Sequence, residues 1–182
     1  MIEDGWEEDV LDFWFSELST DQWYRKDDAV DRTIIERFGA LHEAVAGTDN
    51  TALAASRESA LAAIIVLDQF ARNMFRGSPK SFAGDAKARA LANAALESGF
   101  DADMSASEKQ FLYMPFMHSE TLADQNRAVA LFEALGNADS LKYARLHRDP
   151  IRLFGQFPHR NSILGRPTSP AEQAWIDEHG GF

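Results

Sequence analysis

Hydrophobic residues recur along the chain at three- and four-residue intervals, which is the spacing of an amphipathic helix. No stretch sustains the alternation of apolar and polar residues that a strand requires. The pattern therefore predicts an all-α protein. The expected helices span residues 4–17, 28–46, 51–75, 84–98, 107–117, 121–135, 139–154 and 170–178. The connections between them are short, which favours antiparallel helix hairpins within one domain over residues 1–182.

Several helix boundaries carry explicit signals. Two serine–glutamate pairs have the spacing of a capping box, Ser105 with Glu108 and Ser169 with Glu172. Two prolines fall inside expected helices. We expect Pro115 to kink the chain before His118, and the Asp149-Pro150 pair to end one helix and begin another.

The helix expected near residues 57–75 is apolar on every side over residues 60–67, which predicts a central, buried helix. Its apolar stripe continues into Asp68 and Arg72, and Gln69 and Asn73 form a second i, i+4 pair one step around. A carboxylate on a buried helix needs a partner, and Arg72 is the nearest candidate. Two interpretations remain open. Either the pair ties helices together, or Asp68 orients Arg72 and leaves its guanidinium free for a carboxylate or phosphate.

The next polar group follows an aromatic, methionine-rich helix end. His118, Ser119 and Glu120 come directly after it, in a position that suits a site because it presents side chains from the end of a rigid element. Alternatively, Ser119 or Thr121 is a helix cap and Glu120 complements the helix dipole, an account that gives His118 no role. Gln125 lies within the apolar stripe of the following helix, so we expect it to have a buried partner.

The segment from Phe154 to Arg166 is the most informative part of the chain. It places His159, Arg160, Asn161 and Arg166 among aromatic residues, glycine and proline. Hydrogen-bond donors are costly to bury in a hydrophobic core, and this short segment contains many of them. The segment is therefore predicted to form part of a site. His147 closes the preceding helix, where the helix dipole alone also favours a histidine.

Charge is unevenly distributed in this strongly acidic chain, whose formal net charge is -11. Residues 1–31 hold eleven carboxylates against two cations, a net of -9, and residues 142–166 hold six cations against one carboxylate, a net of +5. The two regions either attract each other and close the domain, or the second forms a local anion site. An acidic protein is not expected to bind nucleic acid.

Other classes of protein receive no support from the sequence. The chain has no cysteine, which removes disulfides, thiolate nucleophiles and cysteine-bound zinc. Its longest apolar run, residues 60–67, is far shorter than the roughly 20 residues that span a bilayer. It begins with acidic residues and not with a secretory signal. We expect a soluble, cytoplasmic protein with no metal and no cofactor, because no metal-ligand, nucleotide-loop or hydrolase motif is present.

Three segments together resemble a known bacterial family in their order and spacing. They are Leu67–Gly77, Phe111–Glu120 and Phe154–Arg166, and Phe13-Trp14-Phe15 adds a weaker match. The family is Domain of Unknown Function 924, and the resemblance runs from about residue 10 to residue 176. It implies an all-α, tetratricopeptide-like helical fold and no established activity. The chain departs from the family pattern at three positions. Gln156 replaces an arginine, Ala71 replaces a proline, and Trp23-Tyr24 replaces paired tryptophans.

Three functions are compatible with these observations. The first is a helical domain with a cationic pocket for a small anionic molecule or a peptide. The second is a hydrolase-type enzyme in which His118 or His159 is the general base, Glu120 or Asp68 orients it, and Arg72 and Arg160 stabilise negative charge. The third is a protein-interaction scaffold whose polar clusters only clamp helices. The candidate site residues are Asp68, Gln69, Arg72, Asn73, His118, Ser119, Glu120, Gln125, His147, His159, Arg160, Asn161 and Arg166.

Overall fold

The computed structural model describes residues 2–181, and within that range it contains helices and no strand. The all-α prediction is therefore confirmed. The longer helices are α1 (Trp6–Asp12), α2 (Asp28–Gly47), α4 (Arg57–Ile64), α6 (Asp85–Glu97), α7 (Ala106–Met117), α8 (Leu122–Leu135), α9 (Ala138–Phe154) and α11 (Pro170–His179). The shorter ones are η1 (Phe13–Glu17), η2 (Thr20–Trp23), α3 (Asn50–Leu53), η3 (Ile65–Phe70), α5 (Ala71–Met74), η4 (Pro79–Phe82), η5 (Phe100–Asp103), η6 (Pro158–Arg160) and α10 (Asn161–Leu164).

The core is built around α4 and η3. All side chains from Ser59 to Ala71 are buried, so the expected central helix is confirmed. Aromatic rings from η1 and α2 pack against Phe70 at the end of η3, and the rings of Phe38 and Phe70 lie 4.8 Å apart. The η3 segment is a π-helix, a local widening of the α-helix that often accompanies functional sites. It holds Asp68 and Gln69 inside this core.

The helix expected over residues 51–75 is divided in the structure. The short helix α3 ends at Leu53, and α4 begins only at Arg57. Ser56 causes the break because its side chain accepts a hydrogen bond from the Ser59 amide and caps α4. The prediction of one continuous helix was therefore wrong at its N-terminal end.

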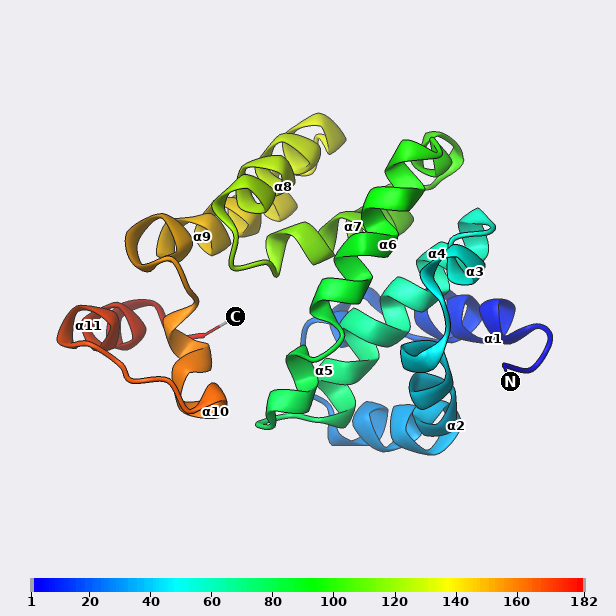
Figure 1. Ribbon diagram of the computed structural model, residues 1–182, viewed down its shortest axis with the longest axis horizontal. Helices are drawn as coiled ribbons and strands as arrows, with labels where there is room; N and C mark the ends of the chain where they lie inside the picture. The colour runs from blue at the N-terminus through cyan, green and yellow to red at the C-terminus, as the bar shows by residue number, and fades with distance from the viewer. Residues whose placement is uncertain (1, 182) are drawn as a thin grey trace.

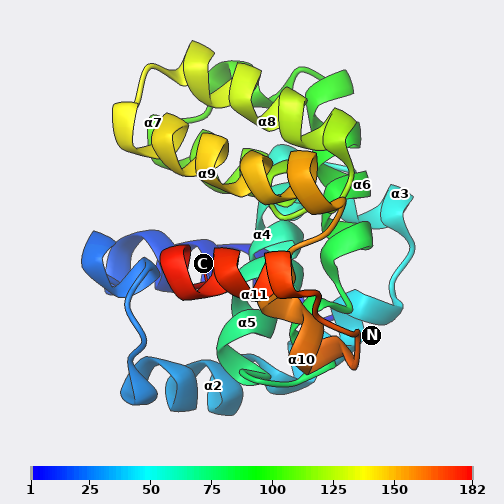
Figure 2. The ribbon, with the colours of Figure 1, turned by 90° about the vertical axis from the view of Figure 1, so that its left-hand side faces the viewer.

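After α6, α7 packs against α8 and α8 packs against α9, each pair antiparallel. Figures 1 and 2 show α8 and α9 side by side. Gly136, with φ +77°, makes the tight turn between them. Neither proline ends its helix. α9 runs unbroken through Pro150, so the predicted division at this residue was wrong. An interior proline removes a helical hydrogen bond and crowds the preceding turn, but Pro150 is buried, so tertiary packing and not the local sequence decides that the helix continues.

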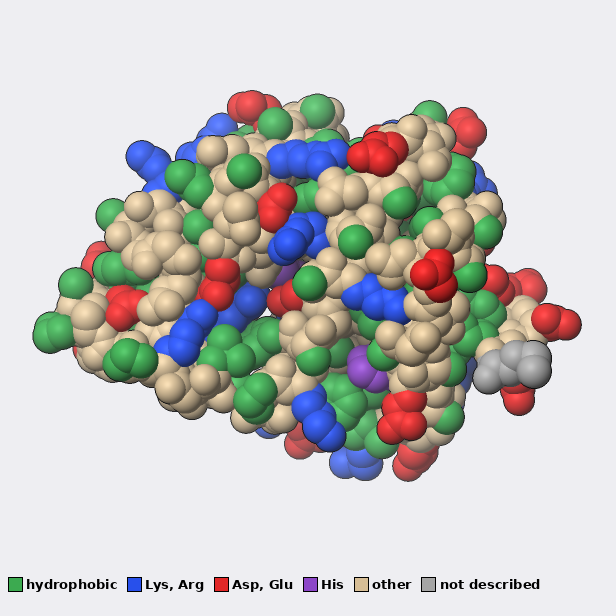
Figure 3. Space-filling model, in the orientation of Figure 1, with side chains coloured by type: hydrophobic (Ala, Val, Ile, Leu, Met, Phe, Trp, Pro, Cys, Tyr) green, Lys and Arg blue, Asp and Glu red, His purple; other side chains and the backbone are tan. Residues whose placement is uncertain are grey.

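The last part of the chain, residues 155–181, forms a C-terminal arm that carries η6, α10 and α11. Figure 1 shows the arm on the left of the molecule, opposite α5 and α6. Within the described residues, the main hydrophobic cluster draws its members from Trp6 to Ala144 and none from the arm. Figure 3 shows that this face of the molecule is hollowed between the arm and α5, with basic, acidic and histidine side chains in the hollow.

Candidate functional site

Asp68 is the centre of the polar network. Its side chain is fully buried, and its carboxylate accepts hydrogen bonds from Gln69 Nε2 at 2.5 Å and from His118 Nδ1 at 2.8 Å. The nearest guanidinium nitrogen of Arg72 lies 3.1 Å away. Burial alone would raise the pKa of Asp68, but the charge of Arg72 and the contact with His118 outweigh it and hold the pKa well below its usual range. Asp68 is therefore ionised at neutral pH.

Arg72 joins two carboxylates. Its two terminal nitrogens donate to the two carboxylate oxygens of Asp85 at 3.0 and 3.1 Å, and one of them also donates to the backbone oxygen of Asp68 at 2.6 Å. Its guanidinium is consequently not free, and the arrangement matches the ion-pair interpretation of the Asp68–Arg72 spacing. Asp85 begins α6, and no feature of the sequence around it indicated a role in this network.

His118 is held by Asp68 at the C-terminal end of α7. An ionised carboxylate can only accept, so Nδ1 carries the proton and Nε2 carries the lone pair. Within residues 2–181, Nε2 makes no hydrogen bond to the protein, and the side chain is 12% exposed. Burial lowers the pKa of His118, Arg72 lowers it further, and Asp68 opposes both. The imidazole is therefore neutral at neutral pH and offers one unused acceptor.

Arg160 reaches this network from the C-terminal arm. It donates to Asp85 at 3.3 Å and to the backbone oxygen of His118 at 3.1 Å. Its guanidinium lies over two aromatic rings, 4.4 Å from the centre of Phe82 and 4.5 Å from that of Phe157. Burial lowers the pKa of Arg160 to about 10, against the opposing charge of Asp85, so the side chain remains charged at neutral pH.

The other two candidate histidines lie beside the network. The ring of His147 is 5.9 Å from that of His118 and 5.9 Å from Phe157, and the ring of His159 is 5.5 Å from Phe157. Burial lowers the pKa of His147 to about 3 and that of His159 to about 4. Both imidazoles are neutral at neutral pH. His147 therefore adds a polar but uncharged group beside His118.

A second cluster fastens the arm to the turn between α7 and α8. Arg166 donates to both oxygens of Glu120 at 2.7 and 2.9 Å, and its Nε donates to Asn161 at 2.9 Å. The Phe157 amide donates to Glu120 at 2.8 Å. Burial would raise the pKa of Glu120, but Arg166 and the Phe157 amide outweigh it and lower the pKa. Glu120, Asn161 and Arg166 thus position the arm that supplies Arg160.

Three candidate residues have other partners. Asn73 donates to Asp31 at 2.7 Å, away from Asp68. Ser119 donates to Asp124 at 2.7 Å and accepts from the Thr121 amide at 3.1 Å, so it stabilises the turn before α8, whose N-cap is Thr121. The Gln125 amide donates to the backbone oxygens of residues 117 and 119, each at 2.7 Å, so the expected buried partner is confirmed.

The fold and these contacts define an all-α protein with a buried Asp–Arg–His network where α7, α6 and a C-terminal arm meet. The chain belongs to the family described as bacterial protein of unknown function (DUF924), which matches residues 10–180. It is similar to the solved structure of a protein of unknown function from Agrobacterium tumefaciens, with 40% identity and a TM-score of 0.89 over 94% of this chain and 97% of the other. No match to the chain was found among curated proteins.

Three further observations concern the C-terminal arm, metal binding and membrane helices. Gln156, where the family pattern has arginine, donates to Glu172 at 2.6 Å, so the shorter side chain still links the start of the arm to α11. Among the residues that the structure describes, no group of three or more histidine or carboxylate side chains is arranged to hold a metal ion. No helix in this range is long and apolar enough to cross a bilayer.

Proposed function

We propose that the Asp68–His118 pair belongs to the active site of a hydrolase-type enzyme, with His118 as the general base. The observation that supports this proposal is the pairing of His118 Nδ1 with a buried carboxylate while Nε2 has no partner among residues 2–181. A catalytic base needs a deprotonated acceptor at working pH, and the lowered pKa of His118 supplies one.

The chemistry of the pair follows from its charges. Nε2 would remove a proton from a water molecule or a hydroxyl group bound in the hollow of Figure 3. The imidazolium that forms would be stabilised by Asp68 at 2.8 Å, and the same contact fixes the orientation of the ring. Asp68 thus positions the base, and it has no further proton to give or accept at neutral pH.

Arg160 is the group best suited to stabilise negative charge that develops on the substrate. Its bond to Asp85, at 3.3 Å, is longer than the two that Arg72 makes, and its buried Nε makes no hydrogen bond to residues 2–181. Arg72 is held more tightly, because its terminal nitrogens donate to Asp85 at 3.0 and 3.1 Å and one of them also donates to the backbone oxygen of Asp68 at 2.6 Å.

The charge balance points to the class of substrate. Asp68 and Asp85 offset Arg72 and Arg160, so the ionised groups of the network sum to zero. A doubly charged phosphate would find no excess of positive charge here, whereas a neutral ester or amide would find a base and a nearby cation. This balance favours a carboxyl derivative over the free anionic ligand that the sequence suggested first.

The test compares His118→Asn with His42→Asn on a panel of chromogenic carboxylic esters, anilides and phosphate esters. His42 serves as the control because it lies elsewhere, with its ring 5.3 Å from Phe75. We expect the wild type and His42→Asn to hydrolyse a carboxyl derivative, and His118→Asn to be slower by about 10²- to 10⁴-fold. The rate should rise with pH through a pKa below the usual histidine value near 6.5. Equal rates for the two variants would refute the assignment.

Access to Nε2 can be measured without knowing the substrate. Diethyl pyrocarbonate acylates neutral imidazole nitrogens, and mass spectrometry locates the product. We expect His118 to react in the folded wild type. In Asp68→Asn, the rate at which His118 is acylated should change, because the carboxylate that orients the ring is lost. Complete protection of His118 in the native protein would show that its lone pair is not available to a substrate.

A further inference from the structure

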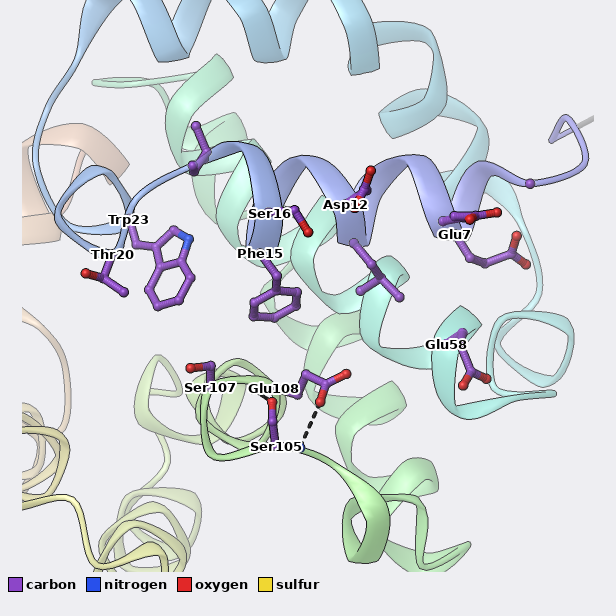
Figure 4. Close-up of a pocket in the computed structure, with 14 residues that line it drawn as sticks. Glu7, Asp12, Phe15, Ser16, Thr20, Trp23, Glu58, Ser105, Ser107 and Glu108 are labelled. Atoms are coloured by element: carbon purple, nitrogen blue, oxygen red, sulfur yellow. Dashed lines mark hydrogen bonds between the residues drawn. The ribbon is translucent and has the colours of Figure 1, made fainter.

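A second hollow lies between α1 and the start of α7, and it shares no lining residue with the Asp68–His118 network. Its volume is about 870 Å³, within the range of roughly 300–1,000 Å³ that is typical of ligand sites. Figure 4 shows it as a groove with α1 and η1 above and the first turn of α7 below. We call it the α1–α7 groove.

One end of the groove is apolar and rigid. Phe15 and Trp23 project into it above Ser105 and Ser107 of α7 (Figure 4). Their rings lie 5.9 Å apart, and both pack edge-on against Phe111, at 5.7 and 5.0 Å. The Trp23 indole nitrogen donates to the backbone oxygen of residue 14 at 2.8 Å, which fixes the ring. This end therefore offers preformed aromatic surface at little entropic cost to a ligand.

The rest of the groove is acidic. Five carboxylates and no lysine or arginine line it, namely Glu7, Glu8, Asp12, Glu58 and Glu108. Glu58 is paired with Arg57 at 2.7 Å, and Glu108 caps α7 through the Ser105 amide. Within residues 2–181, Glu7 and Glu8 take part in no ion pair. Figure 4 places Glu7 and Glu58 at the end away from the aromatic rings.

We propose that the α1–α7 groove binds a cationic peptide segment of a partner protein. A bulky apolar side chain of the segment would lie against Phe15 and Trp23, and lysine or arginine side chains next to it would meet Glu7 and Glu8. Charge complementarity selects this occupant, because the same carboxylates repel acidic peptides, anionic lipid headgroups and nucleic acid. Aromatic anchors beside a charged rim are the usual composition of a peptide-binding site.

The test uses a fluorescein-labelled amphipathic peptide that carries leucine and phenylalanine on one face and lysine on the other, with its binding to the full chain measured by fluorescence anisotropy. A matched peptide has glutamate in place of lysine. We expect the lysine peptide to bind, with an affinity that falls as salt screens the charges, and the glutamate peptide not to bind. Equal binding of the two peptides, or equal displacement by spermine and by unlabelled peptide, would overturn the proposal.

Variants test whether the lysine peptide binds at the α1–α7 groove. Glu7→Gln combined with Glu8→Gln removes one partly buried and one exposed charge, and we expect binding of the lysine peptide to weaken about fivefold or more. The control, Glu36→Gln with Glu178→Gln, changes the net charge equally at exposed residues that do not line the groove. Phe15→Ala should also weaken binding, and if it disturbs the fold the two glutamine variants still decide the question. Equal affinity of both pairs would refute a site at this groove.

Discussion

Replacing Arg72 with methionine removes the cation that two carboxylates share. The guanidinium lies 3.1 Å from Asp68, which is fully buried, and 3.0 Å from Asp85. Removing one partner of a buried ion pair costs about 3–5 kcal/mol, because the remaining charge stays buried with neither its partner nor water to compensate it. Arg160 still holds Asp85 after the change, so we expect a loss near the lower end, about 3 kcal/mol in the free energy of unfolding.

The same substitution should change the titration of His118. Burial and the charge of Arg72 both lower the pKa of His118 and Asp68 raises it, so removal of the arginine takes away one of the two lowering effects. We expect the pKa of His118 to increase in Arg72→Met. Urea unfolding gives the free energy, and NMR titration of the imidazole gives the pKa.

Arg145→Met is the matched control for Arg72→Met. Its side chain is 52% exposed and lies 3.3 Å from Glu133, an ion pair in contact with solvent. Such pairs contribute about 0–1 kcal/mol. If Arg72→Met costs no more than Arg145→Met, the network around Asp68 does not behave as a buried ion pair and the reasoning is refuted.

Three other predictions follow from the contacts of the site. Burial lowers the pKa of His147 to about 3 and of His159 to about 4, so between about pH 6.5 and 4 the unfolded chain binds protons that the folded chain does not. The free energy of unfolding should therefore decrease as the pH is lowered through that window, by about 1.4 kcal/mol per pH unit for each of the two histidines, and a flat profile in urea titrations would contradict this. Glu120→Gln removes the charge that its paired arginine binds, so amides of the C-terminal arm should exchange hydrogen faster while those of α2 are unchanged; equal exchange in the arm would count against its polar attachment. Gly84→Ala would place a Cβ 2.6 Å from the backbone oxygen of Leu67 in η3, so it should cost about 1–3 kcal/mol in thermal denaturation, and an unchanged Tm would disprove the close contact.

Local features of the fold could be predicted from the sequence because they depend on residues a few positions apart. The capping box of Ser105 and Glu108 is present with both of its hydrogen bonds. The central helix was expected from its continuous apolar run, and the need of Gln125 for a buried partner followed from its position in an apolar stripe. The break before α4 had a local signal as well, in Ser56, which helical periodicity across residues 51–75 concealed.

Long-range contacts could not be predicted in the same way. The spacing of Asp68 and Arg72 indicated one ion pair, but the second carboxylate comes from Asp85, whose position depends on how α6 packs on η3. Likewise, His118 and Arg160 each suggested a site, and only the return of the C-terminal arm brings Arg160 to the backbone oxygen of His118. A single sequence contains the chemical groups, whereas helix packing decides which of them meet.

The protonation of His118 tests the central claim most directly. Nitrogen-15 NMR of the imidazole ring distinguishes the two neutral tautomers from the charged form, and His118→Asn identifies the signal. We predict that at neutral pH the ring is neutral, with the proton on Nδ1 and an unprotonated Nε2. A charged imidazolium, or a neutral ring with its proton on Nε2, would contradict the assignment of His118 as a base positioned by Asp68.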